Sequence, residues 1–113
     1  MSAVYNFPID QFATFSTTIT IKDSLDVVRD LTGYIAKMQV RFRHKGGPLV
    51  FTLSIDDGLS INPDTNVITV IINAERTSML KDDAFYDIIL IDSNDNVERI
   101  LEGQLLINEG VTR

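Results

Sequence analysis

The chain has 113 residues, enough for one domain with a single hydrophobic core but too few for two. Apolar residues make up 44% of it and charged residues 23%, which is typical of a folded globular protein rather than a disordered one. The absence of cysteine excludes disulfides and thiolate metal sites, and the net charge of −6 argues against a nucleic-acid partner.

No segment has the pattern of a targeting or membrane-spanning sequence. Residues 1–10 lack a basic stretch followed by an apolar one, and no apolar run approaches the ~18 residues needed to cross a bilayer. We therefore expect neither targeting nor membrane insertion.

Alternating side chains predict two strands in the first half of the chain. In residues 14–21, Phe15, Thr17, Ile19 and Ile21 share one face, and shorter hydroxyl side chains share the other. Residues 34–42 repeat the period of two, with basic and amide side chains between apolar ones.

Turn residues then divide the chain into further short strands. The Gly-Gly-Pro at 46–48 ends the second strand, and residues 51–55 begin a third. Asp-Asp-Gly at 56–58 and Asn-Pro-Asp at 62–64 bracket a brief apolar stretch. Residues 67–72 form a β-branched run without a charge, which is typical of a central strand.

A short helix is expected before the last strands. Residues 74–80 have helical periodicity over about two turns. Glu75 and Arg76 would face water, whereas Met79 and Leu80 would be able to pack inward.

Two further strands, residues 85–91 and 97–107, are joined by a turn rich in Asn and Asp at 92–96. About seven short strands with one short helical connection predict an all-β, immunoglobulin-like antiparallel β-sandwich. Tyr86 stands where such folds place a tyrosine whose hydroxyl bonds back to the preceding connection; the alternative is a plain core aromatic. We expect one domain over residues 1–113, with 1–12 as a candidate N-terminal arm.

The sequence carries no recognisable catalytic or cofactor motif. Its single histidine, His44, has neither a cysteine nor a second histidine for metal binding, and Gly-rich phosphate loops are absent. We predict no enzymatic activity, no catalytic residue, no cofactor and no metal. The basic cluster, which we interpret as the solvated face of a strand, comprises Lys37, Arg41, Arg43, His44 and Lys45.

The acidic residues leave one chemical alternative open. Residues 92–96 resemble half of a calcium loop but lack its glutamate and glycine, so an ion site is possible and a turn between strands is favoured. The adjacent acids at 56–57 and 82–83 are interpreted as solvated. A small hydrolase would need a deep pocket in which two carboxylates converge.

Both faces of the last two strands are apolar, although a two-sheet sandwich covers only the inner face of each sheet. Ile89 and Ile91 lie on the face of their strand opposite to Ile88 and Leu90. Ile100 of the next strand is expected to face outward like Ile89. We predict a protein interface, covered by the N-terminal segment or by a second protein; scattered exposed isoleucines are the alternative. The predicted interface residues are Tyr5, Phe7, Phe12, Ile89, Ile91, Ile100 and Leu106.

Two parts of the chain resemble small virion proteins of tailed phages. The first is Phe-Pro-Ile-Asp-Gln-Phe-Ala-Thr-Phe at 7–15, then Asp-Leu-Thr-Gly-Tyr at 30–34 and Ala-Lys-Met-Gln-Val-Arg at 36–41. The second runs from Tyr-Asp-Ile-Ile-Leu-Ile-Asp-Ser at 86–93 through Arg-Ile-Leu-Glu-Gly-Gln-Leu at 99–105 to Val-Thr-Arg at 111–113.

These proteins are similar to the immunoglobulin-like amino-terminal domain of phage baseplate upper proteins, which attach receptor-binding proteins to the tail. The chain departs from them at Phe12, where the family pattern usually has glycine. It also has no helical or receptor-binding extension within its 113 residues, which leaves an adaptor role open.

The resemblance implies a non-enzymatic virion structural protein, made in the bacterial host cytoplasm, that belongs to the tail, baseplate, neck or fibre attachment. Its partners would be other phage structural proteins and copies of itself, with no nucleic acid and no membrane. The alternatives are a capsid decoration protein and a carbohydrate- or host-surface-binding module. A sugar-stacking platform is disfavoured because the chain has no tryptophan and three tyrosines.

Overall fold

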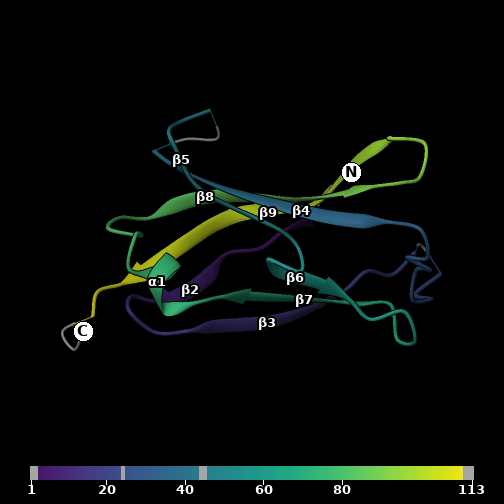
Figure 1. The fold of residues 1–113 in the computed structure, drawn as a ribbon, viewed down its shortest axis with the longest axis horizontal. Helices are drawn as coiled ribbons and strands as arrows, with labels where there is room; N and C mark the ends of the chain where they lie inside the picture. The colour runs from purple at the N-terminus through teal and green to yellow at the C-terminus, as the bar shows by residue number, and fades with distance from the viewer. Residues whose placement is uncertain (1–2, 24, 44–45, 111–113) are drawn as a thin grey trace.

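Strands form two layers that face each other across one core (Figure 1). The computed structural model describes residues 3–23, 25–43 and 46–110. Its elements are β1 (Ala3–Val4), β2 (Phe7–Asp10), β3 (Phe15–Thr20), β4 (Ile35–Phe42), β5 (Leu49–Ile55), β6 (Gly58–Ile61), β7 (Val67–Ile72), α1 (Ala74–Thr77), β8 (Ala84–Ile91) and β9 (Val97–Asn108). The strand order is β1-β9-β8-β4-β5-β6-β7-β3, and β2 also pairs with β9.

The sheet curls between β5 and β6, so that β6, β7 and β3 lie across from β4, β8 and β9 (Figure 1). The predicted period of two accounts for the core between the layers. Along β8 every second residue from Ala84 to Leu90 is buried, and β4 and β7 alternate in the same way. The all-β sandwich predicted from this alternation is confirmed.

The structure has nine strands among its described residues rather than about seven, because the N-terminal segment expected as an arm contributes β1 and β2. Residues 56–57 turn the chain from β5 into β6, which pair in parallel over two residues. β1 and β2 pair in parallel with β9, while the remaining strand pairs are antiparallel. The segment expected as an N-terminal arm thus lies, from residue 3 onward, along its own sheet.

A β-bulge in β9 corrects the predicted orientation of Ile100. Ile88 lies opposite Leu101, but the next residue, Ile89, lies opposite Arg99, so Ile100 is the extra residue. The bulge reverses the alternation, and Ile100 and Leu101 both point into the core. Ile100 is 9% exposed, so the expectation that it faces outward is wrong.

The N-terminal strands are fastened to the core through Tyr86. Its ring lies in the core, one of the two alternatives for this residue, and its hydroxyl donates to the backbone carbonyl of Tyr5 at 2.7 Å and not to the helical connection. Tyr86 is itself buried, and burial raises the pKa of its phenol, which stays protonated as the donor. Gly103 permits this approach, because a Cβ there would overlap the Tyr5 carbonyl oxygen.

The helix is shorter than expected and faces differently. Asn73 caps α1 by accepting from the backbone N–H of Arg76 at 2.8 Å, and the chain leaves the helix at Ser78. Leu80 packs inward as predicted, but Met79 is 44% exposed because the helix does not continue to it. Within the described residues, no helix has the length and hydropathy to cross a membrane.

Carboxylate and amide side chains hold several of the turns. The Asp92 carboxylate accepts the backbone N–H groups of Asn94 and Asn96 at 2.8 and 2.9 Å, and the Asn96 side chain at 3.0 Å. Asp23 and Asn62 make comparable bonds in their own turns. These bonds within residues 92–96 are those of a turn between strands, which the sequence favoured over an ion site.

Candidate interaction surface

The candidate surface is the side of the β4–β5–β8–β9 layer that points away from the core, which we call the outer face. Strand register fixes its rows, since directly opposed residues of neighbouring strands share a face. Lys37 is opposite Ile89, and Gln39 is opposite Asp87. On β4, β8 and β9 the outer face includes Ile35, Lys37, Gln39, Arg41, Phe85, Asp87, Ile89, Ile91, Val97, Arg99, Glu102, Gln104 and Leu106.

The centre of the outer face is polar and internally bonded. Arg41 donates to the side chain of Gln39 at 3.0 Å and to the carbonyl of Gly47 at 3.1 Å. Arg99 donates to the Asp87 carboxylate at 3.0 Å. These are partly solvated pairs, each contributing less than about 1 kcal/mol to stability, and they mainly hold the side chains flat against the sheet.

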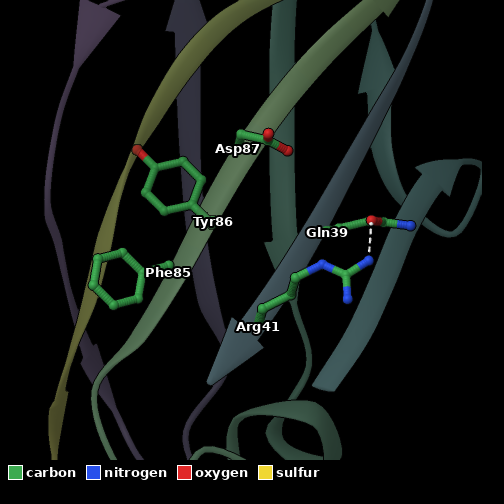
Figure 2. A pocket seen from close by; sticks show the side chains of 5 residues that line it. All are labelled: Gln39, Arg41, Phe85, Tyr86 and Asp87. Carbon is green, nitrogen blue, oxygen red and sulfur yellow. Dashed lines mark hydrogen bonds between the residues drawn. The ribbon is translucent and has the colours of Figure 1, made fainter. Parts of the chain in front are cut away.

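A small hollow lies in this polar centre. Figure 2 shows Gln39 and Arg41 of β4 on one side of it and Phe85 and Asp87 of β8 on the other. Its volume is about 60 Å³, whereas a small-molecule site usually has at least ~300 Å³. The hollow therefore suits a few water molecules or one side chain of a partner.

Apolar residues gather where the outer face meets the β8–β9 hairpin. Ile35 is directly opposite Ile91, and Ile91 is directly opposite Val97. Ile89 lies one row further along the same face of β8. Ile35 and Val97 are 51% and 62% exposed. We call these four residues the hairpin-end patch, and they are contiguous because opposed side chains in a sheet contact each other.

The connection between β3 and β4 adds apolar side chains at the same end of the sandwich (right in Figure 1). Arg29 of this connection makes a two-point contact with the Glu98 carboxylate of β9, at 2.7 and 2.8 Å. The guanidinium thereby lowers the pKa of Glu98. Leu25, Val27 and Val28 are exposed on the segment that this pair holds in place.

The structure places the predicted interface residues in different parts of the molecule. Ile89 and Ile91 lie on the outer face, half-buried by their neighbours, while Ile100 lies in the core. Phe7 packs within the chain, with its ring 5.5 Å from those of Phe15 and Tyr86. The remaining members of the prediction are Tyr5 and Leu106, which are exposed, and Phe12, which is half-buried.

Phe12 adopts a φ of 67°, the left-handed conformation that favours glycine. Ile35 and Val97 were missed by the sequence reasoning. The alternation along β4 could have identified Ile35, because it lies on the face opposite to the core-facing residues of that strand. The face on which Val97 lies depends on the bulge in β9, so alternation alone could not have identified it.

The adjacent acids at 56–57 and 82–83 lie between β5 and β6 and just before β8. A hollow of about 320 Å³ contains Asp56 and Asp57, but the Asp57 carboxylate accepts from Arg76 at 3.0 Å, which lowers its pKa. A general acid requires the opposite shift. Among the described residues, no three His, Cys, Asp or Glu side chains are placed to hold a metal. His44 and Lys45 of the predicted basic cluster, and residues 111–113, lie outside the described residues.

Neither a family model nor a curated protein matches this chain. Among solved structures, a crystal structure of a chicken TCR is similar, with a TM-score of 0.60 and 15% sequence identity. The match covers 95% of this chain and 54% of the TCR chain, so the present chain spans about half the length of that one. At this identity the likeness shows the fold alone: the chain is an immunoglobulin-like β-sandwich.

Proposed function

We propose that this chain is a non-enzymatic structural component of a bacteriophage particle that works through protein–protein contacts at the hairpin-end patch. Its place would be the tail, baseplate, neck or fibre attachment. The resemblance of residues 7–41 and 86–113 to tailed-phage virion proteins supports the assignment to a particle. The observation that carries the proposed mode of action is the contiguous row Ile35–Ile91–Val97 on the outer face.

The row supports an interface because it is apolar, ordered by strand register and open to solvent. Single exposed aliphatic residues are common, but a contiguous group beside a polar, internally bonded surface matches the core and rim of a protein interface. Full burial of an aliphatic side chain contributes about 1.5–3 kcal/mol. The exposed parts of four such residues are enough to orient a partner that also contacts the polar centre.

Exposed positions of the patch allow a test that leaves the core intact. The double variant Ile35→Thr/Val97→Thr removes apolar surface at two exposed residues. The single variant Ile71→Thr is the control, because Ile71 is 46% exposed on β7 in the other layer. Each variant is supplied in place of the natural chain, and the amount retained in purified particles is measured by quantitative immunoblot.

We expect the patch variant to be depleted from particles at least about tenfold, since loss of about 1.4 kcal/mol weakens binding by that factor. The control should be retained as the natural chain is. Equal retention of both variants would show that the contact is made elsewhere. Absence of the natural chain from particles would overturn the virion assignment itself.

A further inference from the structure

The outer strand of the second layer, β3, has an open edge. It stands at one end of the strand order and pairs with β7 over six residues without interruption. Within the described part of the chain, no strand pairs with its other edge. Backbone N–H and C=O groups on an open edge are a template for another strand.

This edge lacks the features by which proteins prevent such pairing. Residues 12–21 contain no charged residue and no proline, and the register of β3 against β7 shows no bulge. At the opposite end of the order, β1 has two residues, and β2 carries Pro8 and Asp10. Short length, proline and charge all discourage pairing, so β3 is the unprotected edge.

We infer that two copies of this chain associate by antiparallel pairing of their β3 edges. The charge of the chain favours a second copy over a basic partner. A basic partner would be drawn to carboxylates, and β3 has none. Because the chain carries a net charge of −6, copies repel each other generally, but at an uncharged strand they meet without like charges directly opposed.

The sequence of β3 is self-complementary about Thr17. When a twofold axis passes through Thr17, Phe15 lies opposite Ile19 of the second copy, and Ser16 lies opposite Thr18. Phe15 and Ile19 are half-buried on the inner face, whereas Ser16 and Thr18 are exposed on the other face. The two copies thus form two aromatic–β-branched pairs and two hydroxyl pairs, and pairs of both kinds stabilise antiparallel strands.

There is room beside the edge for this pairing. A groove of about 390 Å³ separates the second half of β3 from the N-terminal segment, and Thr18 and Thr20 line it together with Val4 and Tyr5. Val4 and Tyr5 are exposed there. Pairing would cover part of this apolar wall, and it uses a surface different from the hairpin-end patch, so it does not depend on the proposed function.

Two double variants at the same positions test the pairing and its register. Ser16→Lys/Thr18→Lys places like charges directly opposite each other twice, and Ser16→Glu/Thr18→Lys places opposite charges there. The first variant adds two positive charges and so reduces the magnitude of the net charge from −6 to −4, which would favour association if overall repulsion were the controlling factor. Thr69→Lys is the control, since Thr69 is the neighbour of Thr18 on β7, away from the edge.

The readout is the mass at sedimentation equilibrium from micromolar to millimolar concentration. We expect the natural chain and Thr69→Lys to approach twice the 12.7 kDa of one copy. The dissociation constant of Ser16→Lys/Thr18→Lys should exceed that of Ser16→Glu/Thr18→Lys at least about tenfold. A natural chain that stays at 12.7 kDa at every concentration, or equal dissociation constants for the two double variants, would overturn the inference. Because particles are not involved, either result is independent of the virion assignment.

Discussion

Replacing Gly103 by alanine should displace the segment around Tyr5 from β9 without unfolding the rest of the sandwich. A Cβ at residue 103 would overlap the carbonyl oxygen of Tyr5 and come within 2.7 Å of its carbonyl carbon. Both are backbone atoms, so the clash cannot be relieved by rotating a side chain. The segment around Tyr5 has to move away from β9.

The cost follows from the bonds that this movement breaks. They are the Tyr5 N–H to the Glu102 carbonyl at 2.9 Å, the Tyr86 hydroxyl to the Tyr5 carbonyl at 2.7 Å, and the Gln104 N–H to the Asn6 side chain at 2.9 Å. At about 1 kcal/mol each, they sum to roughly 3 kcal/mol. Alanine in place of a strand glycine returns about 0.5–1 kcal/mol. The net loss in the free energy of unfolding should be about 2 kcal/mol.

Urea denaturation followed by circular dichroism measures this loss, and hydrogen exchange locates it. With a slope of about 2 kcal/mol per molar urea, the midpoint should fall by roughly 1 M. The amides of Tyr5 and Gln104, whose bonds are broken, should lose protection, while those of β4 and β8 keep it. Gly33→Ala is the comparison for backbone strain alone, because Gly33 has a φ of 82°, which alanine adopts only with strain, but nothing lies within 4 Å of a Cβ there. It should lower the midpoint while the amides of Tyr5 and Gln104 stay protected. An unchanged midpoint with protected amides at Tyr5 and Gln104 in Gly103→Ala would refute the reasoning.

Three further predictions follow from contacts elsewhere. Arg29 holds the pKa of Glu98 below its ordinary value of 4.5, so this pair stabilises the fold above that pH, and the stabilisation is lost as the pH falls through the lowered pKa. The melting temperature of Glu98→Gln should therefore fall less on acidification than that of the natural chain. Parallel curves of melting temperature against pH would contradict this. Asp92→Ala should lower the melting temperature, because the Asp92 oxygens accept three hydrogen bonds that hold the β8–β9 turn. For the same reason, millimolar calcium should leave the melting temperature of the natural chain unchanged. A rise with calcium would show an ion site. Thr77 is fully buried and its hydroxyl donates to the Ala13 carbonyl at 2.9 Å. Thr77→Val should therefore lower the free energy of unfolding, measured by urea denaturation, by about 1–3 kcal/mol, while Thr52→Val, at a half-exposed residue of β5, should lower it little. Equal effects would mean that the hydroxyl bond is dispensable.

The sequence determined which residues form strands better than it determined how the strands meet. The boundaries of β3, β4, β7 and β8 could be predicted because burial alternates along each strand, and this alternation appears in the sequence as a period of two. Alternation does not identify the neighbour of a strand, so the parallel pairing of β2 with β9 was not predicted. The partner of the Tyr86 hydroxyl is 81 residues away, which no local pattern reveals.

The candidate surface was predicted in part for a similar reason. Ile89 and Ile91 lie on the outer face because β8 keeps its alternation throughout. Ile100 was misplaced because a bulge changes the parity of β9, and the glycine of this strand, Gly103, lies three residues beyond the bulge and does not indicate its position. Ile35 joins the patch through strand register, which the sequence of one strand does not contain.

Immunogold electron microscopy of purified particles, with an antibody against this chain, tests the central claim most directly. The account predicts label at one fixed place on the particle, at the tail, baseplate, neck or fibre attachment. Label spread over the head would favour the alternative of a capsid decoration protein. Particles without label, from a preparation in which the antibody detects the free chain, would contradict the proposal that this immunoglobulin-like sandwich is part of a virion.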